Sequence, residues 1–123
     1  MKCVYCTTDA MDWAAENGHL GVVQWLHENG DECTTLAMDL AARNGHLEVV
    51  KWLHHNRTEG CTTLAMDYAA DNGHLDVMRW LYENRGEGCT GSATYFAISH
   101  DNLQILKWLY KNDLEEIRPD YMN

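Results

Sequence analysis

Cysteine and histidine recur in this sequence at a spacing that could serve metal binding. The string CTTLAMD begins at Cys33 and again at Cys61, and twelve residues separate each cysteine from a following histidine, His46 or His74. Thiolate and imidazole are preferred zinc ligands. However, the recurrence of the whole string indicates a structural repeat. Equivalent residues of stacked helical repeats lie about 10 Å apart, too far to share one zinc ion. We therefore expect the cysteine to be a small buried residue and the histidine to order a turn.

A pair of cysteines near the N-terminus offers the alternative of a small metal or redox site. Cys3 and Cys6 precede His19 as they would in a Cys2His2 zinc finger. The next histidine, His27, follows after seven residues, whereas a finger requires about three to five. The pair also lacks the strand-then-helix context of a redox motif. A site built from Cys3, Cys6 and His19 stays an alternative hypothesis, and we expect no bound metal or cofactor.

Aspartates recur in the same way, at Asp12, Asp39 and Asp67. Paired carboxylates can carry out acid–base catalysis, but no histidine or nucleophile can be placed beside them. A row of hydrogen-bonded or solvated carboxylates is the favoured interpretation. The sequence also contains no nucleophile–base pair, phosphate loop or cofactor motif, which indicates a protein that is not an enzyme.

Charge and composition exclude several classes of partner. The 123 residues carry a formal net charge of −10, which disfavours nucleic acid and anionic membrane surfaces and makes a basic protein surface the natural complement. No apolar run approaches the roughly 20 residues of a membrane span. Five cysteines are an odd number, and the N-terminus has no apolar core of a signal peptide. We expect an intracellular protein with free thiols.

The spacing of the candidate residues belongs to an internal repeat. Trp25, Trp52, Trp80 and Trp108 are separated by 27, 28 and 28 residues, and four of the cysteines follow the same steps. A fixed period of this length indicates stacked supersecondary units. The repeat predicts one domain with units at 6–32, 33–60, 61–88 and 89–116 and a tail at 117–123.

Each unit has the pattern of a helix, a turn and a second helix. Residues 34–44 begin with a threonine N-cap and end at Asn44-Gly45, and residues 47–55 form the second helix. In the first helix, small and apolar residues share one side, and Leu36, Asp39, Leu40 and Arg43 share the other. Such helix pairs must stack to bury their apolar sides, so we predict an all-α solenoid of four helix pairs.

The string LAARNGHLEVVKWL resembles the centre of an ankyrin repeat, and Ala-Ala-x-x-Gly-His-Leu occurs at 14–20, 41–47 and 69–75. The period is shorter than the family's usual length of about 33 residues. Leu36-Ala37-Met38-Asp39 also stands where the family has Thr-Pro-Leu-His. The resemblance implies an ankyrin-like protein-interaction scaffold whose β-hairpins are absent or reduced to a tight loop.

The aromatic residues and the ends of the array carry further expectations. The tryptophans of the second helices should pack between adjacent helices with one edge wet. The fourth unit lacks Gly-His and resembles a polar cap. At the other end Val4, Tyr5, Trp13 and Trp25 have no unit to cover them. This end either associates with another molecule, such as a second copy of the chain, or continues a longer array.

Comparison of the units with one another suggests a binding surface. Core registers are nearly constant, whereas registers on the outward side of the first helices differ, which marks either a partner site or tolerant solvated surface. In ankyrin-like stacks the outward side of the first helices lines the concave face. We predict that a protein partner binds there, at Asp12, Glu16, Leu36, Asp39, Arg43, Leu64, Asp67 and Asp71.

Overall fold

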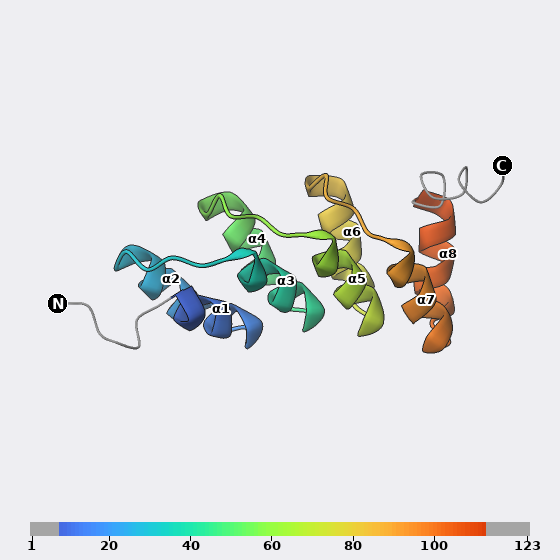
Figure 1. The fold of residues 1–123 in the computed structure, drawn as a ribbon, viewed down its shortest axis with the longest axis horizontal. Helices are drawn as coiled ribbons and strands as arrows, with labels where there is room; N and C mark the ends of the chain where they lie inside the picture. The colour runs from blue at the N-terminus through green and yellow to red at the C-terminus, as the bar shows by residue number, and fades with distance from the viewer. Residues whose placement is uncertain (1–7, 113–123) are drawn as a thin grey trace.

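Eight helices in four antiparallel pairs form a single row (Figure 1), in a computed structural model that describes residues 8–112. The first helices of the pairs are α1 (Thr8–Glu16), α3 (Thr35–Arg43), α5 (Thr63–Asp71) and α7 (Gly91–Ser99). The second helices are α2 (Leu20–Glu28), α4 (Leu47–Asn56), α6 (Leu75–Asn84) and α8 (Leu103–Asn112). No strand occurs among these residues, so the predicted all-α repeat architecture is confirmed.

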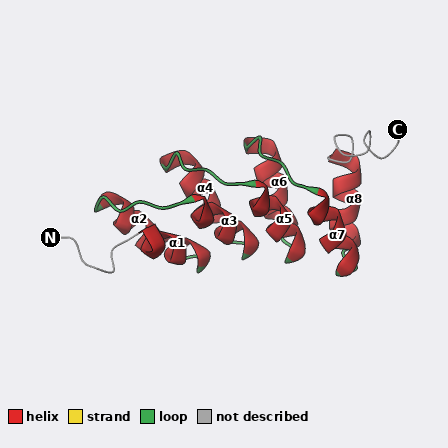
Figure 2. Ribbon diagram, in the orientation of Figure 1, coloured by secondary structure: helices red, strands yellow, loops and turns green. Residues whose placement is uncertain are grey.

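The connections between units replace the hairpins of an ordinary ankyrin repeat. Within the described chain they run as extended loops along one side of the row, from the end of each second helix to the start of the next first helix (Figure 2). Each ends at an N-cap threonine, and the hydroxyl of Thr34 accepts a hydrogen bond from the backbone N–H of Leu36. Thr62 and Thr90 cap α5 and α7 in the same way. The predicted helix starts are therefore confirmed.

Small side chains in the first helices set the distance between units. Alanines occupy the buried registers Ala37, Ala41 and Ala42 of α3, and the equivalent residues of α5 are alanines too. Close backbone approach follows, and successive first helices make most of the contacts between units. In α1, α3 and α5 one methionine per helix fills the remaining space of the core, and Met38 of α3 is fully buried. The inner row is therefore tightly packed.

The second helices lie farther apart, and aromatic side chains fill the space between them. Successive second helices make far less backbone contact than successive first helices. His27 of α2 packs edge-to-face on Trp52 of α4 with ring centroids 5.1 Å apart, and His54 packs on Trp80 at the same distance. Both tryptophans are partly buried, as predicted for rings with one wet edge. The aromatic side chains thus fill the space between second helices whose backbones make little contact.

Each Gly-His turn packs on the next one. Gly18 and Gly45 have φ of +75° and +77°, a conformation that an L side chain rarely adopts. A Cβ at Gly45 would lie 2.7 Å from the imidazole of His74 in the following unit. The histidine side chain makes no capping bond to its own helix, so it orders the turns by stacking on the preceding glycine. The fourth unit places Asn102 in this register, 3.5 Å from the equivalent position at Gly73.

The expectation of a polar cap is wrong for the described part of the fourth unit. Ile98 is 61% exposed, although the alanines of its register, Ala15, Ala42 and Ala70, are at most 1% exposed. Leu103 and Tyr110 of α8 are 59% and 58% exposed. These side chains face the position that a following unit would occupy. The polar sequence DLEEIRPDYMN at 113–123, which also favours a cap, lies outside the described residues.

Replacing Gly45 by alanine tests the turn. We expect G45A to lower the free energy of unfolding by more than about 1 kcal/mol, because the residue must keep a positive φ and its Cβ meets His74. G21A is the matched control, since Gly21 lies inside α2 with open space around it, and helix propensity predicts a gain of up to about 1 kcal/mol. Urea unfolding followed by circular dichroism measures both. Equal effects of the two substitutions would contradict this account.

Candidate interaction surface

The recurring aspartates connect each unit to the next through a repeated pair of hydrogen bonds. The backbone N–H and the hydroxyl of Thr62 donate to the two carboxylate oxygens of Asp39, at 2.9 and 2.7 Å. Asp12 accepts the same pair from Thr34, at 3.0 and 2.8 Å, and Asp67 accepts it from Thr90, at 2.9 and 2.6 Å. Each threonine is also the N-cap of its helix. The carboxylate of one unit thus fixes the residue that starts the helix of the next.

Burial of these aspartates corrects the predicted binding face. Asp12, Asp39 and Asp67 are 3%, 1% and 3% exposed, so the expectation that they point outward beside Leu36 and Arg43 is wrong. The helical periodicity places Asp39 on the same side as Leu36 and Arg43, but in the structure the adjacent unit covers its carboxylate and donates two hydrogen bonds to it. The sequence alternative of a hydrogen-bonded row is confirmed. Burial raises the pKa of Asp39 and of Asp67 above the usual range, and the hydrogen bonds from Thr62 and Thr90 oppose that rise.

The other predicted surface residues divide into exposed leucines and paired charges. Leu36 and Leu64, in the same register of α3 and α5, are 46% and 39% exposed. Arg43 donates to the Glu16 carboxylate of the preceding unit at 2.8 Å. Asp71 lies 2.7 Å from the Nε2 atom of His100 in the following unit. The structure brings these residues onto the outward side of the first helices, with their charges already engaged across unit boundaries.

The cysteines before the first helices are packing residues next to an ion pair. Cys33 and Cys61 are buried free thiols. Arg57 forms two hydrogen bonds with the Glu59 carboxylate close to Cys33, and Arg85 does the same with Glu87. Burial, followed by the negative charge of the glutamate, raises the pKa of each of the two thiols to about 12. These cysteines are therefore thiols, and not nucleophilic thiolates, at neutral pH.

The same arginines join the loops to the preceding second helix, a role that the sequence analysis missed. Arg57 lies 3.1 Å from Nδ1 of His27, and Arg85 lies 3.0 Å from Nδ1 of His54. Since a guanidinium only donates, the arginine is the donor and Nδ1 the acceptor in each of these hydrogen bonds. Burial, together with the positive charge of Arg85, lowers the pKa of His54. The recurrence of Arg-x-Glu at 57–59 and 85–87 is the sequence signal that could have revealed these contacts.

No metal site is formed within residues 8–112, where no three histidine, cysteine, aspartate or glutamate side chains gather closely enough. His19 is the N-cap residue of α2 and its side chain makes no capping bond. Cys3 and Cys6, the other members of the alternative site, lie outside the described residues. None of the helices in the described part is long and apolar enough to cross a membrane.

The geometry defines a class of protein: a helical repeat solenoid whose antiparallel pairs are joined by extended loops and stacked through conserved internal registers. The family model for ankyrin repeats (3 copies) matches residues 11–90 and again 38–120. The chain therefore belongs to the ankyrin repeat family. No curated protein matches the chain. Ankyrin repeats are in general protein–protein interaction modules, and proteins built from them are typically scaffolds without enzymatic activity.

Removing the Asp39 carboxylate tests its role between units. We expect Asp39→Ala to lower the free energy of unfolding by about 2–4 kcal/mol, because it leaves the N–H and hydroxyl of Thr62 without an acceptor. Asp39→Asn should cost about half as much, since an amide can accept from the N–H and donate to the hydroxyl.

Glu48→Ala is the control for these two substitutions. Glu48 is exposed, and its carboxylate lies 3.9 Å from the Lys51 ammonium, so the expected effect is below about 0.5 kcal/mol. Chemical denaturation of the three variants in parallel gives the ranking. An alanine variant as stable as the wild type would show that the buried carboxylate does not hold the units together.

Thiol alkylation tests the environment of the cysteines. With a pKa of about 12, Cys33 and Cys61 are each ionised to the thiolate in roughly one molecule in 10⁴ at pH 8. We expect iodoacetamide at pH 8 to leave both unmodified in the folded protein and to label them rapidly in denaturant, as read by peptide mass spectrometry. Rapid labelling of either cysteine in the folded protein would contradict the buried thiol.

Proposed function

We propose that this chain is a non-enzymatic scaffold that binds a protein partner on the outward side of its first helices. The observation that carries the proposal is the pair of exposed leucines, Leu36 and Leu64, which repeat in the same register of adjacent helices. Most other large apolar side chains of these two units are buried or half-buried, so an exposed leucine that recurs between units is better suited to a contact than to packing.

The proposed surface, called here the first-helix face, consists of the five predicted residues that remain on the outward side. They are Glu16, Leu36, Arg43, Leu64 and Asp71. The tight packing of α1, α3 and α5 holds these side chains on a rigid base, which lowers the entropy lost on binding. Adjacent units repeat at roughly 10 Å, so a partner segment that crosses the helices meets one leucine per unit.

The charged residues of this face and its leucines are expected to contribute differently to binding. Glu16 and Arg43 form an ion pair, and the Asp71 carboxylate lies at hydrogen-bonding distance from His100, so these polar groups already have partners within the chain. Apolar contact with the leucines therefore supplies the affinity of the proposed complex. The net charge of −10 acts at longer range and favours association with a partner that has a basic surface.

Substitution of both leucines tests the proposal. In affinity purification from the native cell, quantified by mass spectrometry, we expect Leu36→Asp/Leu64→Asp to reduce recovery of the partner by at least about tenfold, because each change places a charge in an apolar contact. Both side chains are exposed, so the fold should persist, and thermal melting by circular dichroism verifies it.

The matched control places two aspartates on the second helices, at Gln24→Asp and Gln104→Asp. This variant has the same added charge and should recover the partner at the wild-type level. If the two double variants recover the same proteins in the same amounts, the first-helix face is not the binding surface.

A further inference from the structure

At each end of the row, apolar side chains are exposed in registers that neighbouring units cover in the middle of the array. Val49, Val77 and Ile105 occupy one register of the second helices and are at most 2% exposed, because a preceding unit packs on them. Val22, the equivalent residue of α2, is 50% exposed. Trp25 is 61% exposed, whereas the later tryptophans of its register are partly buried. The α2 side of the array is thus an unfilled docking face.

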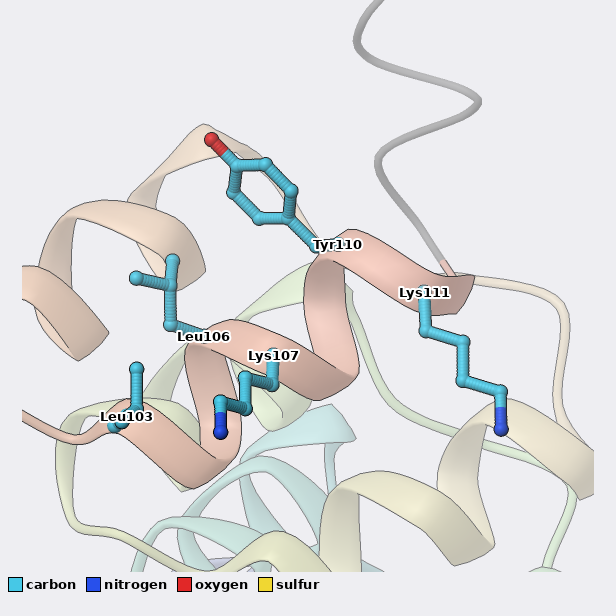
Figure 3. A pocket seen from close by; sticks show the side chains of 5 residues that line it. All are labelled: Leu103, Leu106, Lys107, Tyr110 and Lys111. Atoms are coloured by element: carbon cyan, nitrogen blue, oxygen red, sulfur yellow. The ribbon is translucent and has the colours of Figure 1, made fainter.

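A groove lies at the opposite end, along α8. It has a volume of about 460 Å³ and is lined by Leu103, Leu106, Lys107, Tyr110 and Lys111 (Figure 3). In the internal units the register of Leu106 is fully buried, as Val23, Val50 and Met78 show. The groove is therefore the side of a second helix that elsewhere receives the second helix of a following unit.

The aromatic register supplies a specific contact between these two ends. Internally, His27, His54 and Tyr82 each pack edge-to-face on the tryptophan of the following unit, and the Tyr82–Trp108 ring centroids are 5.3 Å apart. Tyr110 occupies this register in α8 and is exposed. Trp25 occupies the tryptophan register in α2 and is exposed as well. Tyr110 and Trp25 are the two unmatched members of one repeated contact.

Charge is also complementary between the ends. Lys107 and Lys111 line the groove, whereas the unit at 8–32 contains aspartates and glutamates and no lysine or arginine. Glu28 of α2 lies one turn beyond Trp25 and is exposed. The ends therefore attract one another, while two copies of the acidic end repel.

We propose that the α8 groove binds the α2 face of a second copy of this chain, head to tail, with Trp25 packed against Tyr110. The contact is carried by the second helices. On the first-helix side, Ile98 replaces the buried alanine and Tyr95 replaces the aspartate that holds the next threonine. These two changes prevent a copy from stacking as closely as an internal unit does.

Such an interface is heterologous, because it joins two different surfaces, so it extends to further copies instead of closing at a dimer. It lacks the close packing of first helices and the aspartate–threonine hydrogen bonds of an internal boundary, which favours weak, concentration-dependent association. We expect the weight-average mass to rise from the 14.1 kDa monomer toward larger species between about 10 µM and 1 mM, measured by sedimentation equilibrium.

Two single substitutions identify the geometry. Trp25→Glu disables the α2 face and Tyr110→Glu disables the groove, so each variant alone should stay monomeric over the whole range. Mixed in equal amounts they should form a one-to-one dimer, because each copy supplies the face that the other has lost. Gln104→Glu adds the same charge to α8 outside the groove and should associate like the wild type.

Three results would overturn the proposal. If the wild type stays monomeric over the whole concentration range, the groove does not bind a second copy and has another occupant, such as residues 113–123. A wild type that stops at a dimer, or variants that do not recover association when mixed, would indicate a symmetric contact or none. All variants alter exposed side chains, and their melting curves establish that loss of association is not loss of the fold.

Discussion

The buried carboxylate that accepts two hydrogen bonds from the next unit is the interaction on which the rest of this structure depends. A carboxylate can be buried at a unit boundary only if its oxygens are satisfied, and the N–H and hydroxyl of one threonine satisfy both. The same threonine then caps a first helix. Tertiary stacking and the start of secondary structure are therefore decided by the same few atoms, which explains why the CTT-x-A-M-D pattern repeats as a whole.

The difference in spacing between the two rows follows from side-chain size. Alanines let the first helices approach closely, whereas a histidine or tyrosine and a tryptophan keep the second helices apart. The first helices consequently form a closely packed row. Each surface leucine on the first-helix face is therefore displayed by a helix that is held firmly by its neighbours.

Much of the fold could be predicted from the sequence, because the repeat multiplies each weak signal. The period, helix pairing, threonine caps and buried alanines all follow from local preferences read in several copies. The burial of Asp39 could not be predicted in the same way, since it depends on which neighbour covers the edge of a helix. A wheel drawn for one helix contains no information about the adjacent unit.

The same limitation affects the surface and the ends. Glu16, Arg43 and Asp71 could be placed on the outward side, but their partners across the unit boundaries follow only from the stacking geometry. The loss of Gly-His and the charged sequence that follows predict a polar end at α8. Ile98 belongs to a register that is buried in the other units, and its exposure follows only from the absence of a further unit in the described structure.

The ladder of carboxylates and threonines has a direction. Every carboxylate belongs to an earlier unit and every threonine to a later one, so the bonds run in the order in which a ribosome makes the chain. When a unit is synthesised, the aspartate carboxylate of the preceding unit is already present to accept its hydrogen bonds. The first helix of the new unit can therefore form against the helices that precede it. Assembly of the array can then proceed one unit at a time from the amino-terminal side, without a stage in which several unpaired apolar faces are exposed together.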